Sequence, residues 1–462
     1  MPDSLTDRIR DVLNGGRPSA PPVSPSQASA FAPVKNDGLE SDDLEGILGG
    51  RWCQFESGGC FIVEHRFEPD DCHGHDPVRK VASRLEQSAG AAPLFGGSAS
   101  TPSPFVFFDL ETTGLSGGAG TLAFLVGCAS FDSSGAFVVR QFLLTRCVDE
   151  RALLQAAFRE LARAGSLVSF NGKSFDATVL ETRFLFHRLS WMIDGVPHID
   201  VVHPARQFWK NETCSLIALE REVLGIHRAG DVPGSVIPLQ YFEFVRTGDA
   251  RSLVAVLDHN RMDLLTLAAL TARLLHLAES GPDEARNARE ALALGRVYER
   301  AGMYERARKA FERAVSLNES GAVEIAAVRA LALSLRRARE HHRAAAHWRR
   351  LVEIPSCPAH VTHEAMEALA IHHEHRARDF PAARIFALRS LEEVEIARIP
   401  RVREGVLHRL ERIERKIQKP LQAVLFAPGL KPIGSKPRAA GPPMLRIARP
   451  QVSATQLLLS WS

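Results

Sequence analysis

The sequence has 462 residues, 45% of them hydrophobic, and a formal net charge of +3, so it is long enough for two or three packed domains and is not a disordered chain throughout. Its seven cysteines are odd in number and widely spread, which excludes a disulfide framework and predicts a reducing, cytoplasmic location. No secretory signal and no apolar run long enough to span a bilayer occurs, so we expect no membrane association.

Four regions are expected in chain order. Residues 1–49 join Pro/Ser/Ala-rich sequence to an acidic patch and are predicted to be a disordered arm. Residues 50–282 are predicted to form an α/β domain, and residues 283–415 an all-α domain. Residues 416–462 contain no Asp or Glu and are rich in Pro, Gly and basic residues, which predicts a flexible basic tail.

The first part of the α/β region contains strand-like sequence around residues 60–64, together with cysteines and histidines that suggest a zinc site. Their spacing matches none of the paired Cys-x2-Cys patterns of zinc sites, so we favour scattered structural thiols over a metal centre. The residues concerned are Cys53, Cys60, Cys72, His73 and His75.

The core of the α/β region alternates strand and helix patterns. Strand patterns cover residues 105–109, 122–131, 136–144 and 166–171, and helical periodicity covers 150–164, 175–189, 216–224 and 253–278. Three strands with tight turns, followed by strands alternating with helices, predict a mixed sheet with helices packed on its faces.

The first chemically informative stretch is Phe107-Phe-Asp-Leu-Glu-Thr-Thr-Gly114. Asp109 and Glu111 end a buried strand, and strand alternation places both carboxylates on one face. Paired buried carboxylates are costly unless they are neutralised, and a hard divalent cation is their usual neutraliser. The alternative for this pair alone is a strand end with two solvated acids.

Two later stretches add acids. After the strand ending at Asn171, Gly172 turns the chain and Asp176 opens a helix, whose dipole favours a carboxylate; the alternative is a capping acid. His259 and Asp263 are four residues apart on one face of a helix, and the alternative is a local hydrogen-bonded couple.

Together, these three stretches resemble the motifs of DEDD-type 3′–5′ exonucleases of the ribonuclease H-like superfamily over residues 103–278. More narrowly, the chain is similar to the YprB-like group of bacterial ribonuclease H-like proteins, which join this domain to tetratricopeptide-like helices. The segments that support the narrower resemblance cover residues 219–225, 228–234, 237–241 and 259–260.

The resemblance implies a ribonuclease H-like fold and a two-metal hydrolysis of phosphodiester bonds. Two Mg²⁺ or Mn²⁺ ions about 4 Å apart would be held by the four acids, and His259 would deprotonate or orient the attacking water. In the familiar subclasses, the assisting residue is a Tyr four positions before the last Asp or a His five positions before it. In this sequence the residue four positions before the last Asp is a His, which departs from both patterns. The expected metal ligands are Asp109, Glu111, Asp176 and Asp263.

A nuclease of this kind must grip single-stranded DNA or RNA with basic and aromatic side chains. The residues that we predict to bind the nucleic acid are Thr112, Gly114, Asn171, Lys173, Phe175 and Asn260. The Gly-rich segment 114–120 is expected to let the 3′ nucleotide pass close to the backbone. A second group has either this role or a plain surface and core role: Arg206, Phe208, Trp209 and Lys210.

The all-α region begins with a helix, a turn at Gly302 and a second helix. Its small and aromatic positions resemble the tetratricopeptide repeat, and the alternative is a plain helical bundle. Two functional hypotheses therefore stand: a metal-dependent nuclease, or a catalytically weak nucleic-acid-binding scaffold whose helical repeats bind a protein partner. The clustered acids favour the nuclease.

Overall fold

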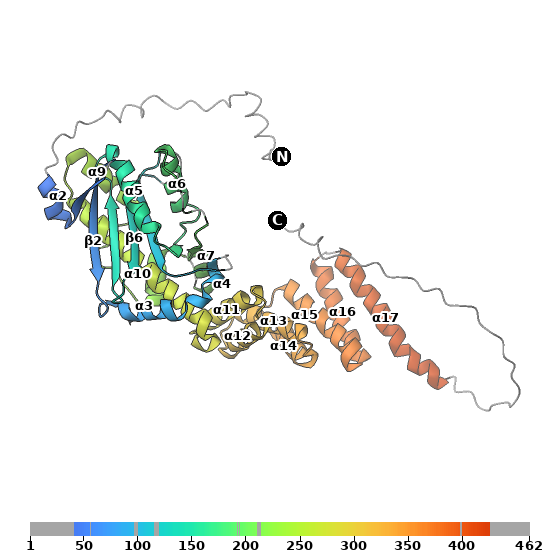
Figure 1. Cartoon of the computed structure of the whole chain (residues 1–462). Helices are drawn as coiled ribbons and strands as arrows, with labels where there is room; N and C mark the ends of the chain where they lie inside the picture. The colour runs from blue at the N-terminus through green and yellow to red at the C-terminus, as the bar shows by residue number, and fades with distance from the viewer. Residues whose placement is uncertain are drawn as a thin grey trace, which may run out of the picture.

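The computed structural model describes residues 41–55, 57–96, 100–114, 120–191, 193, 195–209, 214–397 and 400–425. A seven-stranded sheet organises the N-terminal part (Figure 1). Its first five strands in spatial order are antiparallel, and the last two run parallel to the fifth. The spatial order is β1 (Arg51–Phe55), β2 (Gly58–Phe67), β7 (Phe137–Leu143), β6 (Ala123–Phe131), β5 (Phe105–Thr112), β8 (Ser166–Ser169) and β9 (His198–Asp200).

Helices cover both faces of this sheet. Phe105 and Phe107 of β5 belong to a hydrophobic cluster with α3 (Val78–Gln87) and α10 (Arg251–Ser280). Val106 and Phe108 belong to a second cluster with α5 (Glu150–Leu161) and α6 (Asp176–Phe186). Because side chains alternate along a strand, Asp109 and Glu111 lie on the α10 side of β5.

The predicted mixed α/β sheet with flanking helices is confirmed, and each predicted strand and helix is present with its ends shifted by a few residues. Short elements that the sequence pattern did not indicate complete the domain, among them β9. The others are α4 (Pro93–Gly96), α7 (Val202–Phe208), α9 (Ile237–Thr247), the ribbon β3 (Cys72–His73) and β4 (Asp76–Pro77), and the turns η1 (Ala89–Ala91) and η2 (Cys147–Asp149). The predicted helix over residues 216–224 is formed by α8 (Leu216–Leu219) and the π-helical η3 (Glu220–Leu224).

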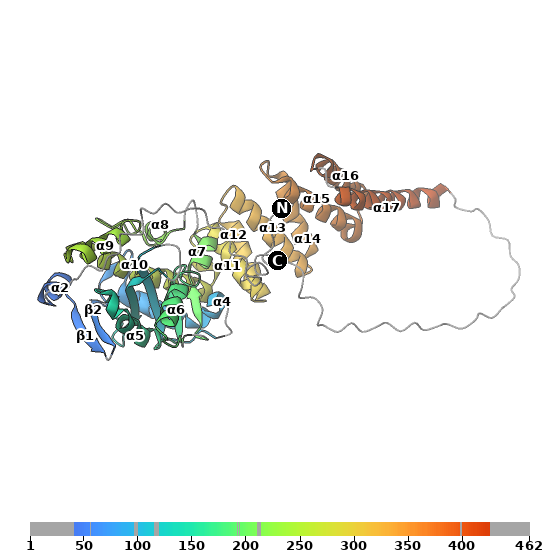
Figure 2. The same ribbon diagram turned by 90° about the horizontal axis from the view of Figure 1, so that it is seen from above.

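The C-terminal part consists of helices that extend away from the sheet (Figure 2). In the first pair, Gly295 lies so close to the Phe311 ring that a β-carbon there would overlap it, which explains the small residue. Gly302 turns the chain between the two helices with a φ of +75°. The helices are α11 (Ala288–Arg300), α12 (Tyr304–Ser316), α13 (Ala322–Arg337), α14 (His341–Glu353), α15 (Ala359–His372), α16 (Phe380–Ala397) and α17 (Pro400–Leu425), with turns η4 (Pro282–Glu284) and η5 (His373–Ala377).

Each predicted terminal segment overlaps a helix of the structure. The prediction of a disordered arm over 1–49 is wrong for α2 (Ser41–Leu48), because Leu44 and Leu48 within the acidic patch are buried in the sheet domain. The prediction of a flexible tail over 416–462 is wrong for residues 416–425, which continue α17; there Lys416 pairs with the buried Glu374 at 2.7 Å. Residues 1–40 and 426–462 lie outside the described residues.

The predicted domain boundary near residue 282 falls at the turn between α10 and α11, but the packing crosses it. Glu290 of α11 accepts hydrogen bonds from Trp209 Nε1 and Arg273 Nη2, each at 2.8 Å, and all three side chains are buried. One hydrophobic cluster runs from Phe107 of the sheet to Trp348 of α14. The helical region therefore completes the core beneath the sheet. In the described part of the chain, no helix is long and apolar enough to cross a membrane.

This continuity predicts how truncation affects folding. A chain of residues 41–282 loses Glu290 and leaves the buried Arg273 unpaired, which costs about 3–5 kcal/mol in such settings. A chain of residues 41–320 keeps α11 and α12, and we expect it to melt at a clearly higher temperature. Thermal unfolding followed by circular dichroism compares the two, and equal melting temperatures would show that the sheet domain is independent.

Candidate active site

The first two acids lie where β5 ends. Asp109 and Glu111 are half-buried and stand on the same face, as predicted from strand alternation. Burial raises the pKa of Asp109 well above its ordinary value, and the charges of Glu111, Asp263 and Asp176 raise it further. Burial, followed by the charges of Asp263, Asp176 and Asp231, raises the pKa of Glu111 to about 8. Acids from three separate stretches therefore converge on this strand end.

Asp109 is held in place from α10. Asn260 Nδ2 donates to Asp109 Oδ2 at 2.9 Å, and Gln141 Nε2 of β7 donates to Asn260 Oδ1 at 2.9 Å. Asn260 is completely buried, so its predicted contact with nucleic acid is wrong. This face of α10 packs on the sheet, which encloses the Asn260 side chain. Asn260 thus fixes one carboxylate of the site.

Asp176 is the first residue of α6 and is buried. The loop before it turns through Asn171, whose φ is +67°. Burial and the neighbouring Asp200 raise the pKa of Asp176 to about 7. The pKa of Asp176 is thus raised even though the residue opens α6, where the helix dipole favours an ionised carboxylate.

Asp200 is an acid that the sequence analysis missed. It ends β9 and is buried, and its carboxylate accepts from the backbone N–H groups of Asn171 at 2.7 Å and Lys173 at 3.1 Å. It therefore holds the loop that presents Asp176. A three-residue strand gives too weak a pattern to be found, and only its parallel pairing with β8 brings Asp200 to this edge.

The third stretch lies on α10, and His259 and Asp263 share a face as predicted. His259 Nε2 stands 3.5 Å from Asp263 Oδ2, and His259 Nδ1 is 2.7 Å from Asp231 Oδ1. Asp231 belongs to the segment between η3 and α9, which sequence analysis quoted for its resemblance but to which it assigned no role. Both imidazole nitrogens of the buried His259 therefore face carboxylates.

Arg228 provides a positive charge beside these acids. It forms an ion pair with Asp263 and a bidentate pair with the buried Glu220, with both N–O distances at 2.7 Å. The pKa of Asp263 remains raised because burial outweighs the opposing effects of Arg228 and His259. The site is thus a group of carboxylates that one arginine neutralises only in part.

The other predicted nucleic-acid contacts fall into two groups. Lys173 and Asn171 are exposed and Phe175 is half-buried, all on the loop before Asp176. Thr112 is buried and donates to the backbone oxygen of Gly114 at 2.9 Å, so it shapes the strand end instead of facing solvent. Residues 115–119 of the Gly-rich segment lie outside the described residues.

The second predicted group divides differently. Arg206 is exposed, whereas Phe208 and Trp209 are buried, as the alternative of a plain surface and core role expects. Phe208 ends α7 and Trp209 follows it, and both rings belong to the hydrophobic cluster beneath the sheet. Lys210 lies outside the described residues.

The chemistry of the carboxylate group fits a hard divalent cation, since carboxylate oxygens are the ligands that Mg²⁺ and Mn²⁺ prefer. As they are placed, however, no three His, Cys, Asp or Glu side chains of the described residues stand close enough together to hold an ion. All seven cysteines are free, and His73 is buried against Thr266.

Comparison with known proteins matches this architecture. Residues 106–275 match the family described as the RNase_H superfamily, and residues 288–320 match the tetratricopeptide repeat. The chain is 36% identical over 227 residues to a protein of Bacillus subtilis (strain 168) named "Uncharacterized protein YprB". That match covers 47% of this chain and 53% of the relative, so the chain spans about half of the relative's length.

The geometry predicts a sensitive glycine behind the site. A β-carbon on Gly127 of β6 would overlap Asn260 Oδ1 and lie 2.9 Å from Leu264 Cδ1. Gly127→Ala should therefore push Asn260 off Asp109 and lower the free energy of unfolding by about 1–3 kcal/mol, as overpacked cores do. Urea unfolding measures the change.

The matched control is Gly234→Ala, at an exposed position with no atom within 4 Å of the new β-carbon. Unfolding midpoints for Gly127→Ala and Gly234→Ala that coincide would contradict the close packing of Asn260 against β6.

Proposed function

Given that residues 106–275 belong to the ribonuclease H superfamily, we propose that this protein is a metal-dependent nuclease, acting as a DEDD-type 3′–5′ exonuclease on single-stranded DNA or RNA. The observation that carries the proposal is the convergence of four carboxylates at the end of β5, where burial and the charges of the neighbouring acids raise the pKa values of Asp109 and Glu111. Such strongly perturbed acids cluster at functional sites. The free cysteines are consistent with a cytoplasmic location.

The proposed ligands are Asp109, Glu111, Asp176 and Asp263, which would hold two Mg²⁺ or Mn²⁺ ions. Bound ions of this kind supply a hydroxide nucleophile at neutral pH and stabilise the leaving oxygen. The chain itself supplies position: Asn260 orients Asp109, Asp200 holds the loop that carries Asp176, and Arg228 orients Asp263.

His259 is proposed to accept the proton of the attacking water. With Nδ1 donating to Asp231, the neutral ring leaves Nε2 without a proton and able to accept one. Because Nε2 also faces Asp263 at 3.5 Å, the competing role is to brace that ligand. The exposed Lys173 and Asn171 lie on the loop next to Asp176, where they would contact the phosphates of a bound strand.

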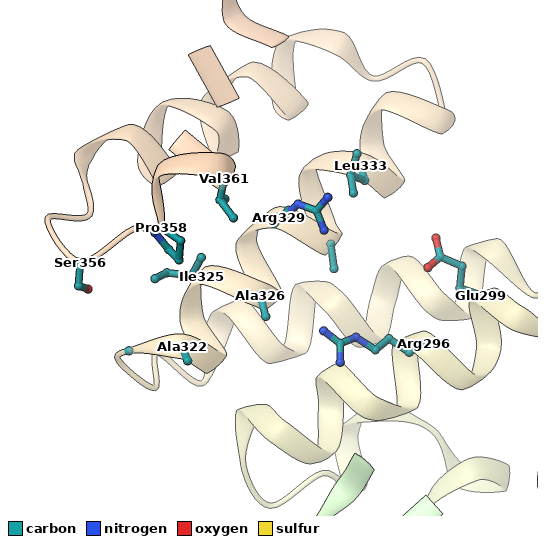
Figure 3. A pocket seen from close by; sticks show the side chains of 12 residues that line it. Arg296, Glu299, Ala322, Ile325, Ala326, Arg329, Leu333, Ser356, Pro358 and Val361 are labelled. Carbon is teal, nitrogen blue, oxygen red and sulfur yellow. The ribbon is translucent and has the colours of Figure 1, made fainter. Parts of the chain in front are cut away.

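A second candidate function rests on the helical repeats. A hollow of about 500 Å³ lies between α11, α13 and α15. Figure 3 shows its lining side chains, Ile325 and Val361 among them. Arg296, also in the lining, is exposed and has no ion pair among the described residues. A hollow of this size suits a protein partner's side chains, which supports the scaffold hypothesis alongside the nuclease.

The central test substitutes single ligands. Asp109→Asn and Asp176→Asn each delete a charge and keep the side-chain shape, so we expect cleavage of end-labelled single-stranded DNA and RNA to be lost while the fold is kept. The wild type should cleave with Mg²⁺ or Mn²⁺ and stop with chelator.

The matched control is Asp258→Asn, on the same helix as Asp263 but 47% exposed and paired with Arg261. It should cleave like the wild type. If Asp109→Asn or Asp176→Asn retains full activity that chelator abolishes in the wild type, the ligand assignment is wrong.

A separate prediction concerns His259. If His259 is the general base, His259→Ala should lower the cleavage rate by roughly 10² to 10⁴ at saturating Mn²⁺ and change the metal affinity little. Asp231→Asn should shift the rate in the same direction, because Asp231 orients the ring. A metal titration of cleavage separates the two roles: full rate at saturating Mn²⁺ would leave His259 as a brace for Asp263.

A further inference from the structure

A second hollow, of about 480 Å³, lies at the end of the helical repeats. It is separate from the carboxylate site and from the hollow of Figure 3. It is formed by the end of α13, by α14, and by the end of α15 with η5. Its floor is apolar and includes Trp348, Ala345 and Ile371. Its rim is basic, with Arg336, Arg376 and three histidines, and no carboxylate is among its lining residues.

The arginines of this rim differ from their neighbours in having no acidic partner. Arg336 and Arg376 are exposed and form no ion pair among the described residues. Arg337, next to Arg336 on α13, is instead paired with Glu299 at 2.6 Å. Glu374 of η5 pairs with Arg412 and Lys416 and lies 3.4 Å from Nε2 of the rim residue His375. The two rim arginines therefore carry positive charge with no carboxylate partner among the described residues.

The histidines add donors to the same rim. The ring of the rim residue His372 lies 5.0 Å from that of His342, edge to face; His342 itself does not line the hollow. The buried Nδ1 of His372 has no hydrogen-bond partner among the described residues. Burial, and then the nearby histidines and Arg349, lower the pKa of His372; burial, and then Arg376, His342 and Arg339, lower that of His341. With lowered pKa values these rings are neutral at pH 7, and they can donate hydrogen bonds to an anion at the rim.

These rings do not form a metal site, because no group of described residues has the arrangement of a metal-binding set. The size of the hollow is within the range of small-ligand pockets. The ligand that fits must carry an anionic group for the rim and a flat apolar body for the floor. A nucleoside phosphate has both parts, and guanidinium groups bind phosphate oxygens in pairs.

We propose that this hollow binds a nucleoside monophosphate unit, with the phosphate between Arg336, Arg376 and His372 and the base against the floor beside Trp348 and Ile371. The choice of a nucleotide over a phosphorylated peptide rests on the proposed function, since hydrolysis of a phosphodiester strand releases such units. The unit is either a released mononucleotide or the phosphorylated end of a strand.

The test uses the full-length Asp109→Asn protein in EDTA, so that neither cleavage nor a metal-bridged phosphate at the carboxylates contributes. Isothermal titration with adenosine 5′-monophosphate should show saturable binding at one site. Arg336→Ala/Arg376→Ala should weaken it about tenfold or more, because two charge-assisted hydrogen bonds are lost. The control Arg337→Ala removes the adjacent, ion-paired arginine and should leave the affinity unchanged.

Further ligands decide the chemistry. The proposal is overturned if adenosine or inorganic phosphate binds as tightly as adenosine 5′-monophosphate. It is also overturned if a phosphoserine peptide binds more tightly than the monophosphate and depends on the same two arginines. A 5′-phosphorylated decanucleotide that binds more tightly than the monophosphate assigns the unit to a strand end, and equal affinity assigns it to the free product.

Wild-type cleavage is measured separately. Nucleotide binding without any cleavage would overturn the proposed nuclease and keep the hollow as a nucleotide site. Cleavage by the wild type without nucleotide binding to the hollow would overturn only the proposal that the hollow is a nucleotide site.

Discussion

The rest of the structure depends on holding like charges together at the end of β5. Four half-buried or buried carboxylates face one another there, and their mutual repulsion, together with loss of solvent, works against this arrangement. What opposes it is a set of hydrogen bonds and ion pairs that come from other segments: Asn260 on Asp109, backbone N–H groups on Asp200, and Arg228 on Asp263. The absence of a side chain at Gly127 lets α10 approach close enough for the first of these. The close packing of α10 on the sheet thus fixes Asp109, while contacts from β9 and Arg228 fix the other carboxylates.

Helix α10 also joins the site to the helical repeats. Its first half carries Asn260 and Asp263, and its second half is almost entirely buried between the sheet and α11. Arg273, further along the same helix, pairs with Glu290 of the repeat region, which also binds Trp209 of the sheet domain. A displacement of α11 by a partner would therefore bear directly on the helix that positions two site residues. Helix α10 therefore connects the proposed nuclease site to the surface proposed for partner binding.

The sequence predicted the acidic residues of the site better than the residues that hold them in place. Strand alternation and helical spacing were enough to place Asp109 with Glu111 and His259 with Asp263, because both patterns act within a single element. Asp200, Asp231 and Arg228 escaped assignment because their roles depend on contacts across β9, the loop before α9, and α10, which no local pattern encodes. The same limit explains the error at Asn260: spacing shows which face of a helix a residue shares, but not what packs against that face. At the termini, two leucines in an acidic patch were enough to form the buried helix α2.

The energetics of the carboxylates bear on whether the fold is a nuclease or only a scaffold. A glutamic acid whose pKa is near 8, as burial and three neighbouring acids make that of Glu111, is destabilising whenever it ionises in the folded state. A protein that used this sheet only to support its helical repeats would gain stability from a neutral residue at Glu111 or Asp109, since substitutions of that kind are readily available. Strained or repulsive arrangements of this type persist where they serve chemistry. Because Arg228 neutralises only Asp263 among the four, the remaining negative charge of the site is left for a cationic ligand.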